Sequence, residues 1–140
     1  MLLNQINLIV RDMDASVAFY RCLGLTFDAE PGATHVEIYF PNKMSIELDS
    51  VKSVEKWNTG WRGPTGPGNV IGFALESRER VDDTYTDLTG AGYRGSQPPF
   101  DAFWGARYAV VEDPDGNGVG LTSPIDADRR LWPPSAPPTP

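Results

Sequence analysis

Cysteine and histidine each occur once in the 140 residues, as Cys22 and His35. A single cysteine excludes an internal disulfide and fits a reducing compartment, so we expect a cytoplasmic protein, with a secreted protein that lacks disulfides as the alternative. Cys22 falls on the apolar stripe of a predicted helix and is expected to be a buried core thiol. With one histidine and no G-x-S-x-G motif, the sequence argues against a serine-type catalytic triad.

Positive charge is also scarce, with 12 Lys and Arg against 19 Asp and Glu and a net charge of −7. This balance argues against a nucleic-acid partner, because binding to phosphates needs a basic surface. The sequence has no phosphate-binding loop and no dinucleotide fingerprint. Near the N-terminus the apolar residues are interrupted by Asn4, Gln5 and Asn7. We therefore expect neither a signal peptide nor a membrane span.

The sequence does contain enough apolar residues, 40%, for one globular domain, which we place at residues 1–123. Its alternation pattern predicts two modules, over about 3–49 and 69–122. The first comprises a strand at 5–10, a helix that ends at Gly24, and strands at 25–30, 34–40 and 44–49. The second comprises a strand at 70–75, a helix at 78–89, and strands at 93–96, 107–112 and 118–122. The predicted fold class is therefore α+β, with two β-α-β-β-β modules that form an internal repeat.

Two stretches fall outside the repeat. Residues 50–68 include Trp57, Trp61 and a cluster of Gly and Pro with little periodicity, which predicts a linker or lid. Residues 97–100 include two adjacent prolines and are expected to be a loop. Residues 124–140 include six prolines and predict an extended or disordered tail, because proline donates no hydrogen bond to a helix or sheet.

The stretch DPDGNG over residues 113–118 matches the start of a calcium-binding EF-hand loop. Such a loop needs a glutamate at its twelfth position, which is Pro124 here, and a helix on each side. The flanking residues instead have the composition of strands. We therefore favour a hairpin turn, in which Gly116 takes a positive φ.

Two motifs resemble the vicinal oxygen chelate superfamily, which includes glyoxalase I, extradiol dioxygenases and bleomycin-resistance proteins. The first is DMDASVAFY over 12–20, followed by LGL over 23–25, and the second is DPDGN over 113–117. The stretch FWGARYA over 103–109 is similar to the bleomycin- and mitomycin-resistance-like branch. The resemblance covers about residues 3–122. It implies the two-module fold and says little about function, because that scaffold hosts many chemistries.

The resemblance also implies four strand positions at which enzymes of the superfamily bind a divalent metal through His, Gln or Glu. They fall on Gln5, Glu47, Val70 and Gly120. Only the first two can supply a ligand, and two side chains hold a hard divalent ion weakly. His35 is a candidate for an irregular ligand, although a lone histidine is more often a surface or hydrogen-bonded residue. We therefore expect no cofactor, with a divalent metal at Gln5 and Glu47 as the alternative.

Strand parity divides the side chains of the first module between two faces. The expected helix-facing core comprises Ile6, Leu8, Val10, Val36, Ile38, Phe40, Ile46 and Leu48. The opposite face carries Gln5, Asn7, His35, Glu37, Tyr39, Ser45, Glu47 and Asp49. The resemblance implies that this polar face lines a ligand cleft, whereas its composition alone fits a solvated face equally well. In the second module the cleft-facing positions are small and leave room for a bulky ligand; they are Val70, Gly72, Ala74, Gly118 and Gly120.

We expect a homodimer that binds a small, aromatic or cationic organic molecule in a metal-free cleft, an antibiotic of the bleomycin or mitomycin type being one candidate. Tryptophans and phenylalanines near the loops would stack on a flat ligand, with core or dimer contacts as their alternative role. The candidate ligand-binding residues are Gln5, Asn7, His35, Glu37, Tyr39, Glu47, Trp57, Trp61, Phe103 and Trp104. One alternative is a metal-dependent lyase, isomerase or dioxygenase of the glyoxalase type that uses Gln5 and Glu47. Another is an accessory module with a macromolecular partner.

Overall fold

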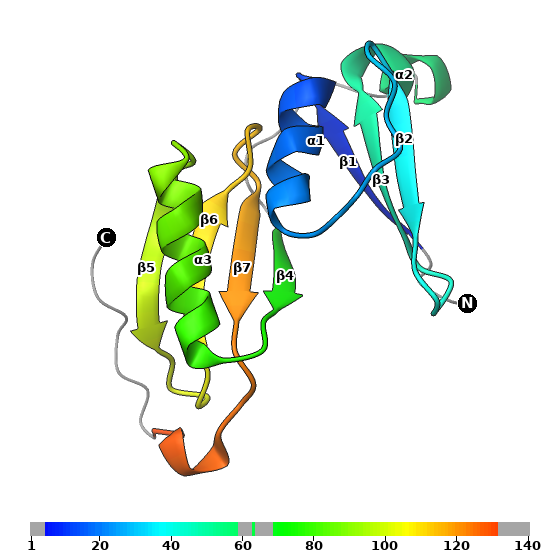
Figure 1. The fold of residues 1–140 in the computed structure, drawn as a ribbon. Helices are drawn as coiled ribbons and strands as arrows, with labels where there is room; N and C mark the ends of the chain where they lie inside the picture. Colours follow the sequence, from blue (N-terminus) through cyan, green and yellow to red (C-terminus); the bar gives the residue numbers. More distant parts are fainter. Residues whose placement is uncertain (1–4, 59–62, 64–68, 132–140) are drawn as a thin grey trace. The chain divides into compact units, whose positions relative to one another are not determined.

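A computed structural model describes residues 5–58, 63 and 69–131 (Figure 1). The chain divides into two compact units, Met1–Thr65 and Gly66–Pro140. Each unit has its own sheet, its own helices and its own core. The predicted α+β class is confirmed.

The first unit contains a three-stranded sheet with the order β1-β3-β2, formed by β1 (Gln5–Val10), β2 (His35–Tyr39) and β3 (Ser45–Ser50). Strand β1 runs parallel to β3, and β2 runs antiparallel to it. Helix α1 (Met13–Cys22) packs against β3 (Figure 1). The helix begins after Asp12, whose Oδ1 accepts a hydrogen bond of 2.9 Å from the Ala15 N–H. A helix cap and alternating strands thus produce the strand at 5–10, the helix that follows it and the two strands near 34–40 and 44–49, all of which were predicted.

The core of the first unit draws on the sheet and on both of its helices. Its most buried large side chains are Leu8, Val10, Val17, Phe19, Tyr20, Phe27, Val36, Leu48 and Val54. Strand parity predicted the buried strand residues correctly, but Ile6, Ile38 and Phe40 are partly exposed. The rings of Phe19 and Tyr20 meet edge to face with centroids 5.0 Å apart.

Cys22 is exposed, so the prediction of a buried core thiol is wrong. The buried side of α1 carries Met13, Val17 and Tyr20, which follow the spacing of one helix face. At about 3.6 residues per turn, Cys22 lies about two and a half turns after Met13 and therefore on the opposite side of the helix.

Two other local predictions for the first unit are wrong. Residues 25–30 form no strand. Leu25 and Phe27 are both buried, so the alternation arises from side chains that enter the core from a segment outside the sheet. Residues 51–57, predicted as part of a linker or lid, form helix α2 (Val51–Trp57). Ser50 caps α2 by accepting a hydrogen bond of 3.2 Å from the Ser53 N–H. A helix of 7 residues is too short to show a clear period in the sequence.

The second unit contains a four-stranded sheet with the order β4-β7-β6-β5. The strands are β4 (Val70–Ala74), β5 (Gly95–Asp101), β6 (Arg107–Glu112) and β7 (Gly118–Thr122). Strand β4 is parallel to β7, while β6 is antiparallel to both β5 and β7. Helix α3 (Arg78–Gly90) covers one face of this sheet (Figure 1). Side chains from that helix and from the sheet form the core, which includes Val81, Leu88, Ala109, Val111, Val119 and Leu121.

Strand β5 passes through Pro98 and Pro99, where a loop was predicted. Two conditions permit this. The strand lies at the edge of its sheet, and its register with β6 shifts between Gln97 and Phe100, so the prolines break no regular ladder. The segment that follows β7 also differs from the prediction of an extended tail, because Ala127–Arg129 form a short 3-10 helix. Residues 132–140 of that predicted tail lie outside the described residues.

The loop between β6 and β7 is the predicted hairpin turn. Asp113 Oδ1 accepts hydrogen bonds from the N–H groups of Asp115 (2.9 Å) and Asn117 (2.8 Å), and its Oδ2 accepts one from Asn117 Nδ2 (2.8 Å). Gly116 has a φ of 86°, as the turn requires. The buried Asp113 carboxylate thus accepts hydrogen bonds from the turn and stabilises it. These bonds explain why Asp, Gly and Asn occur here in an order that resembles a calcium loop.

Candidate functional site

The polar face of the first sheet gathers the side chains that parity predicted to lie together. Gln5 pairs in register with Ser45, and Asn7 with Glu47, across the parallel strands β1 and β3. On the other side of β3, Glu47 pairs with Glu37, and Asp49 with His35. Because alternate residues of a strand share a face, these side chains project from the same side of the sheet.

A pocket of about 300 Å³ lies on this face and is lined by Gln5, Asn7, His35, Glu47, Asp49 and Ser53. We refer to these six residues as the acidic pocket. Four of them belong to the candidate ligand-binding residues predicted from the sequence. Ser53 was missed because it lies on α2, within the predicted linker. Asp49 was predicted to lie on this face, and it lines the pocket there.

Asp49 is the most enclosed group of the acidic pocket, with 3% of its surface exposed. Its carboxylate accepts hydrogen bonds from Asn7 Nδ2 (2.7 Å) and Ser53 Oγ (2.6 Å), and Nδ1 of His35 lies 3.1 Å from it. Burial alone would raise the pKa of Asp49, but the bonds from Ser53, Asn7 and His35 outweigh burial and hold the pKa below its ordinary value. Asp49 is therefore a carboxylate anion at neutral pH.

Glu47 and Asn7 offer further oxygen atoms to the pocket. Glu47 accepts a hydrogen bond of 2.9 Å from Gln5 Nε2 and one of 3.1 Å from Ser45 Oγ. Asn7 is oriented by the bond from its Nδ2 to Asp49, and its Oδ1 is buried without a hydrogen-bond partner among the described residues. A buried acceptor without a partner is unfavourable by about 1–3 kcal/mol, so Asn7 Oδ1 favours a ligand that donates a hydrogen bond or coordinates oxygen.

The two other predicted residues of β2 share the polar face but do not line the pocket. Glu37 accepts a hydrogen bond of 3.1 Å from Tyr39 Oη and lies 3.7 Å from Nε2 of His35. Tyr39 is 67% exposed. Its pKa is raised, first by the hydrogen bond to Glu37 and then by the charge of that carboxylate. Both residues lie along the strand that carries His35, where they can contact a ligand larger than the pocket.

The four-residue metal set implied by the resemblance does not fit this chain. In the second unit Val70 is exposed and has no donor atom. Gly120 has no side chain, and the hydroxyl of Tyr108 lies 2.5 Å from the position a Cβ would occupy there. In the first unit, by contrast, His35, Glu47 and Asp49 each offer a ligand atom, and these atoms lie within 4.8 Å of one another. Oxygen and imidazole ligands suit several divalent metals.

The space predicted in the second unit is partly filled. Tyr108 covers Gly120, and a Cβ at Gly118 would lie 3.0 Å from Cγ2 of Val70. Gly72 is open. The prediction that small residues leave room for a bulky ligand is therefore wrong at Gly118 and Gly120, because neighbouring side chains already occupy that room.

Phe103 and Trp104 are not among the described residues that line the acidic pocket. Phe103 and Trp104 instead line a separate pocket of about 310 Å³, together with Ile125, Arg130 and Leu131 of the same unit. We refer to these five residues as the aromatic pocket. The side chain of Trp57 and the whole of Trp61 lie outside the described part of the chain.

Each unit pairs its first strand with its last in parallel, β1 with β3 and β4 with β7, with a helix after the first strand. This repeat defines a two-module α+β scaffold with a polar pocket on one of its sheets. The chain belongs to the Glyoxalase/Bleomycin resistance protein/Dioxygenase superfamily, whose family model matches residues 2–121. The resemblance identified from the motifs is thus confirmed.

Relatives and solved structures are consistent with this membership. The uncharacterized protein YraH of Bacillus subtilis is 32% identical in an alignment 127 residues long, which covers 86% of this chain and 97% of that protein. A family enzyme from Burkholderia phytofirmans has a TM-score of 0.74 at 20% identity, over 86% of this chain and 96% of its own. A lactoylglutathione lyase from Agrobacterium tumefaciens has a TM-score of 0.65 at 21% identity, over 87% of this chain and 92% of its own. At these identities the two structures establish the fold alone.

None of the helices within the described residues combines the length and apolarity needed to cross a membrane.

Proposed function

We propose that the protein binds a small organic cation with N–H donors, aromatic or joined to an aromatic group, in the acidic pocket without a metal. The observation that carries this proposal is the unpartnered buried oxygen of Asn7 beside the carboxylates of Glu47 and Asp49. A cation that donates hydrogen bonds satisfies that oxygen and complements both carboxylates.

The carboxylates have different roles in this proposal. Asp49 is enclosed and already accepts bonds from neighbouring side chains, so it orients Asn7 and His35 and contributes charge at short range. Glu47 is more exposed and accepts hydrogen bonds from Gln5 and Ser45. It is therefore the carboxylate that would contact the ligand directly. A hydrogen bond to a charged group contributes about 1.5–3 kcal/mol, more than an exposed ion pair.

The exposed Tyr39 beside Glu37 supports the aromatic part of the ligand. A tyrosine face attracts cations and stacks on flat rings, with a contribution of about 0.5–1 kcal/mol at an exposed site. An antibiotic of the bleomycin or mitomycin type is one candidate with this chemistry, and the superfamily name includes bleomycin resistance. The protein would then sequester the compound rather than transform it.

Calorimetric titration with naphthylmethylammonium and with bleomycin tests this function. We expect the naphthylmethylammonium to bind more tightly than about 1 mM and neutral naphthylmethanol to bind at least tenfold more weakly, about 1.4 kcal/mol. Glu47→Gln should weaken binding of the cation by about tenfold. Glu55→Gln removes the same charge from an exposed site on α2 and is the matched control. Equal binding to both variants, or no binding to the folded protein, would exclude the proposal.

A divalent-metal site at His35, Glu47 and Asp49 is a second candidate, favoured by the closeness of their ligand atoms. Such an ion would supply Lewis-acid chemistry, as in a lyase, isomerase or dioxygenase. Gln5 and Asn7 could add amide oxygens from the same face of β1. Elemental analysis of purified protein tests this candidate. Near-stoichiometric metal that is lost in Asp49→Asn, and retained in Asp28→Asn at an exposed site, would replace the metal-free proposal.

A cytoplasmic homodimer is also proposed. An exposed free thiol at Cys22 suits a reducing compartment. Sedimentation velocity tests the dimer, and a monomer at all accessible concentrations would exclude it.

A further inference from the structure

The aromatic pocket contains an arginine among apolar residues, whereas the acidic pocket contains two carboxylates, so the two pockets favour ligands of opposite charge. We propose that it binds a small aromatic carboxylate, with the ring against Phe103 and Trp104 and the carboxylate on Arg130. Its residues all belong to the second unit, and none of them lines the acidic pocket. The inference is therefore independent of the proposed function.

The walls of the aromatic pocket are mainly apolar and accessible. The rings of Phe103 and Trp104 meet edge to face with centroids 5.1 Å apart. Ile125 and Leu131 are among the most exposed large apolar residues described, at 58% and 53%. Covering apolar surface is favourable by about 25 cal/mol per Å². A volume of about 310 Å³ is at the lower end of small-molecule sites, so a compound of one or two rings fits best.

Hydrogen bonds of the backbone join the two segments that form these walls. The Leu131 N–H donates to the Phe103 carbonyl (2.9 Å), and the Asp126 N–H donates to the Gly105 carbonyl (3.1 Å). Gly105 has a φ of 97°, and the Asp126 carbonyl occupies the place where a Cβ would project. Trp104 also contacts Tyr108 edge to face, with centroids 5.3 Å apart. The walls are thus preorganised, which reduces the entropy lost when a ligand binds.

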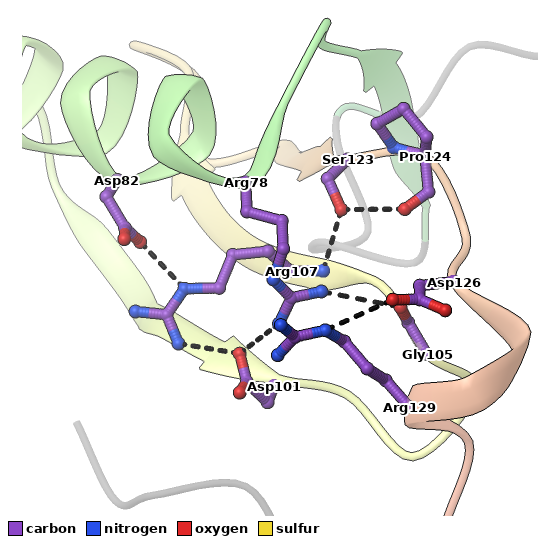
Figure 2. Close-up of polar contacts among 9 residues, drawn as sticks. All are labelled: Arg78, Asp82, Asp101, Gly105, Arg107, Ser123, Pro124, Asp126 and Arg129. Atoms are coloured by element: carbon purple, nitrogen blue, oxygen red, sulfur yellow. Dashed lines mark hydrogen bonds and ion pairs between the residues drawn. The ribbon is translucent and has the colours of Figure 1, made fainter.

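Three arginines of the second unit, Arg78, Arg107 and Arg129, are each paired with a carboxylate (Figure 2). Arg107 pairs with Asp82 through Nε (2.8 Å) and with Asp101 through Nη1 (3.0 Å). Arg78 forms an ion pair with the same Asp101, and its Nη1 donates to the Gly105 carbonyl (3.4 Å). These contacts neutralise both arginines and fix the loop that carries Phe103 and Trp104.

Arg129 and Arg130 are adjacent in sequence but differ in their partners. Arg129 Nε pairs with Asp126 Oδ2 at 3.2 Å (Figure 2). Arg130 Nε donates to the neutral carbonyl of Trp104 at 3.3 Å, and Arg130 has no carboxylate partner within the part of the chain that the structure describes. That one bond places the guanidinium beside the aromatic wall and leaves its terminal nitrogens for a ligand. A guanidinium fork binds a carboxylate through two parallel hydrogen bonds.

Calorimetric titration with naphthoate tests the inference, with neutral naphthylmethanol as the comparison probe. We expect naphthoate to bind more tightly than about 1 mM, and Arg130→Gln to weaken its binding by about tenfold. Arg129→Gln removes the same charge from the neighbouring position, outside the pocket, and should change the affinity by less than about twofold. Naphthylmethanol should bind equally to wild type and Arg130→Gln. Equal loss of naphthoate binding in both arginine variants would indicate a general charge effect and overturn the inference.

Further measurements distinguish a small-molecule ligand from a second copy of the chain as the occupant of this pocket. They also distinguish binding here from binding in the acidic pocket. Ile125→Asp places a carboxylate in the pocket wall and should abolish naphthoate binding without change in the circular dichroism spectrum. If wild type self-associates and Ile125→Asp does not, the pocket is an interface between copies, and the inference fails. Glu47→Gln should leave naphthoate binding unchanged, whereas Arg130→Gln should leave naphthylmethylammonium binding unchanged. Each proposal can thus fail while the other stands.

Discussion

At the scale of single residues, Asp49 links the stability of the first unit to pH. The carboxylate is nearly inaccessible and accepts bonds from Asn7 and Ser53. Its pKa is lower when the protein is folded than when it is unfolded, where it is about 3.9. Such a group stabilises the fold fully above the unfolded pKa, and this contribution is lost as pH falls through the folded pKa.

We therefore predict that Asp49→Asn lowers the free energy of unfolding by about 1–3 kcal/mol at neutral pH, because its donors lose a charged acceptor. The difference from wild type should begin to shrink as pH falls below the unfolded pKa of about 3.9, and it should be lost as pH falls through the lower folded pKa of Asp49. Urea titrations at neutral pH and near pH 3 measure both values. Asp28→Asn, at an exposed position, should show no such pH dependence. A difference from wild type that is the same at both pH values would contradict this assignment.

Strand residues of the acidic pocket could be predicted from the sequence, whereas the contribution of the helix residue and the orientation of the Asn7 amide could not. Strand parity placed Gln5, Asn7, His35 and Glu47 together, because alternation along a strand fixes the face of each side chain. Their role in binding a ligand stays a prediction. Parity gave no information on Ser53, which reaches the site from a helix, or on Asn7 Oδ1, whose missing partner depends on the orientation of one amide.

At the scale of elements, α2 shows how a short helix can shape a site. It follows β3 directly, begins at the Ser50 cap and places Ser53 beside Asp49. Its anchor is Val54, which is 1% exposed. Because an isolated helix of 7 residues is unstable in water, packing of this side chain must hold the element in place.

We predict that Val54→Ala lowers the free energy of unfolding by about 1–3 kcal/mol through loss of buried apolar contact. It should also weaken binding of naphthylmethylammonium, because Ser53 would no longer be held beside Asp49. Glu55→Ala, at the exposed neighbouring position, should have an effect within about 0.5 kcal/mol. Urea denaturation and calorimetry measure the two effects. An intact binding affinity in a destabilised Val54→Ala protein would show that α2 contributes to stability alone.

The elements missed from the sequence have different physical causes. Strand β5 includes two prolines, which an edge strand with a shifted register tolerates but a regular ladder does not. Helix α2 is shorter than the window over which a helical period can be detected. The long helices and regular strands were predicted well, because caps, glycines and alternation act locally.

At the scale of the whole molecule, the internal repeat followed from the alternation pattern, and the superfamily followed from motifs at turns and caps, which local geometry constrains tightly. Asp12 caps α1, and Asp113 accepts three hydrogen bonds within its turn. The structure contains an acidic pocket in the first unit and an aromatic pocket in the second, and the predicted ligand cleft stays a prediction. The lining of each pocket depends on tertiary packing within its unit, which residue types alone do not specify.

The packing of Tyr108 over Gly120 has an evolutionary consequence. A glutamate at position 120 is what the resemblance implies for a metal-dependent relative, yet any side chain there meets the Tyr108 ring. Tyr108 also contacts Phe100 and Trp104, so its removal disturbs the aromatic cluster. A glutamate at position 120 therefore requires the Tyr108 ring to move or to be replaced. The two positions are coupled, so the effect of a substitution at one depends on the residue at the other, and the order in which such substitutions can accumulate is constrained.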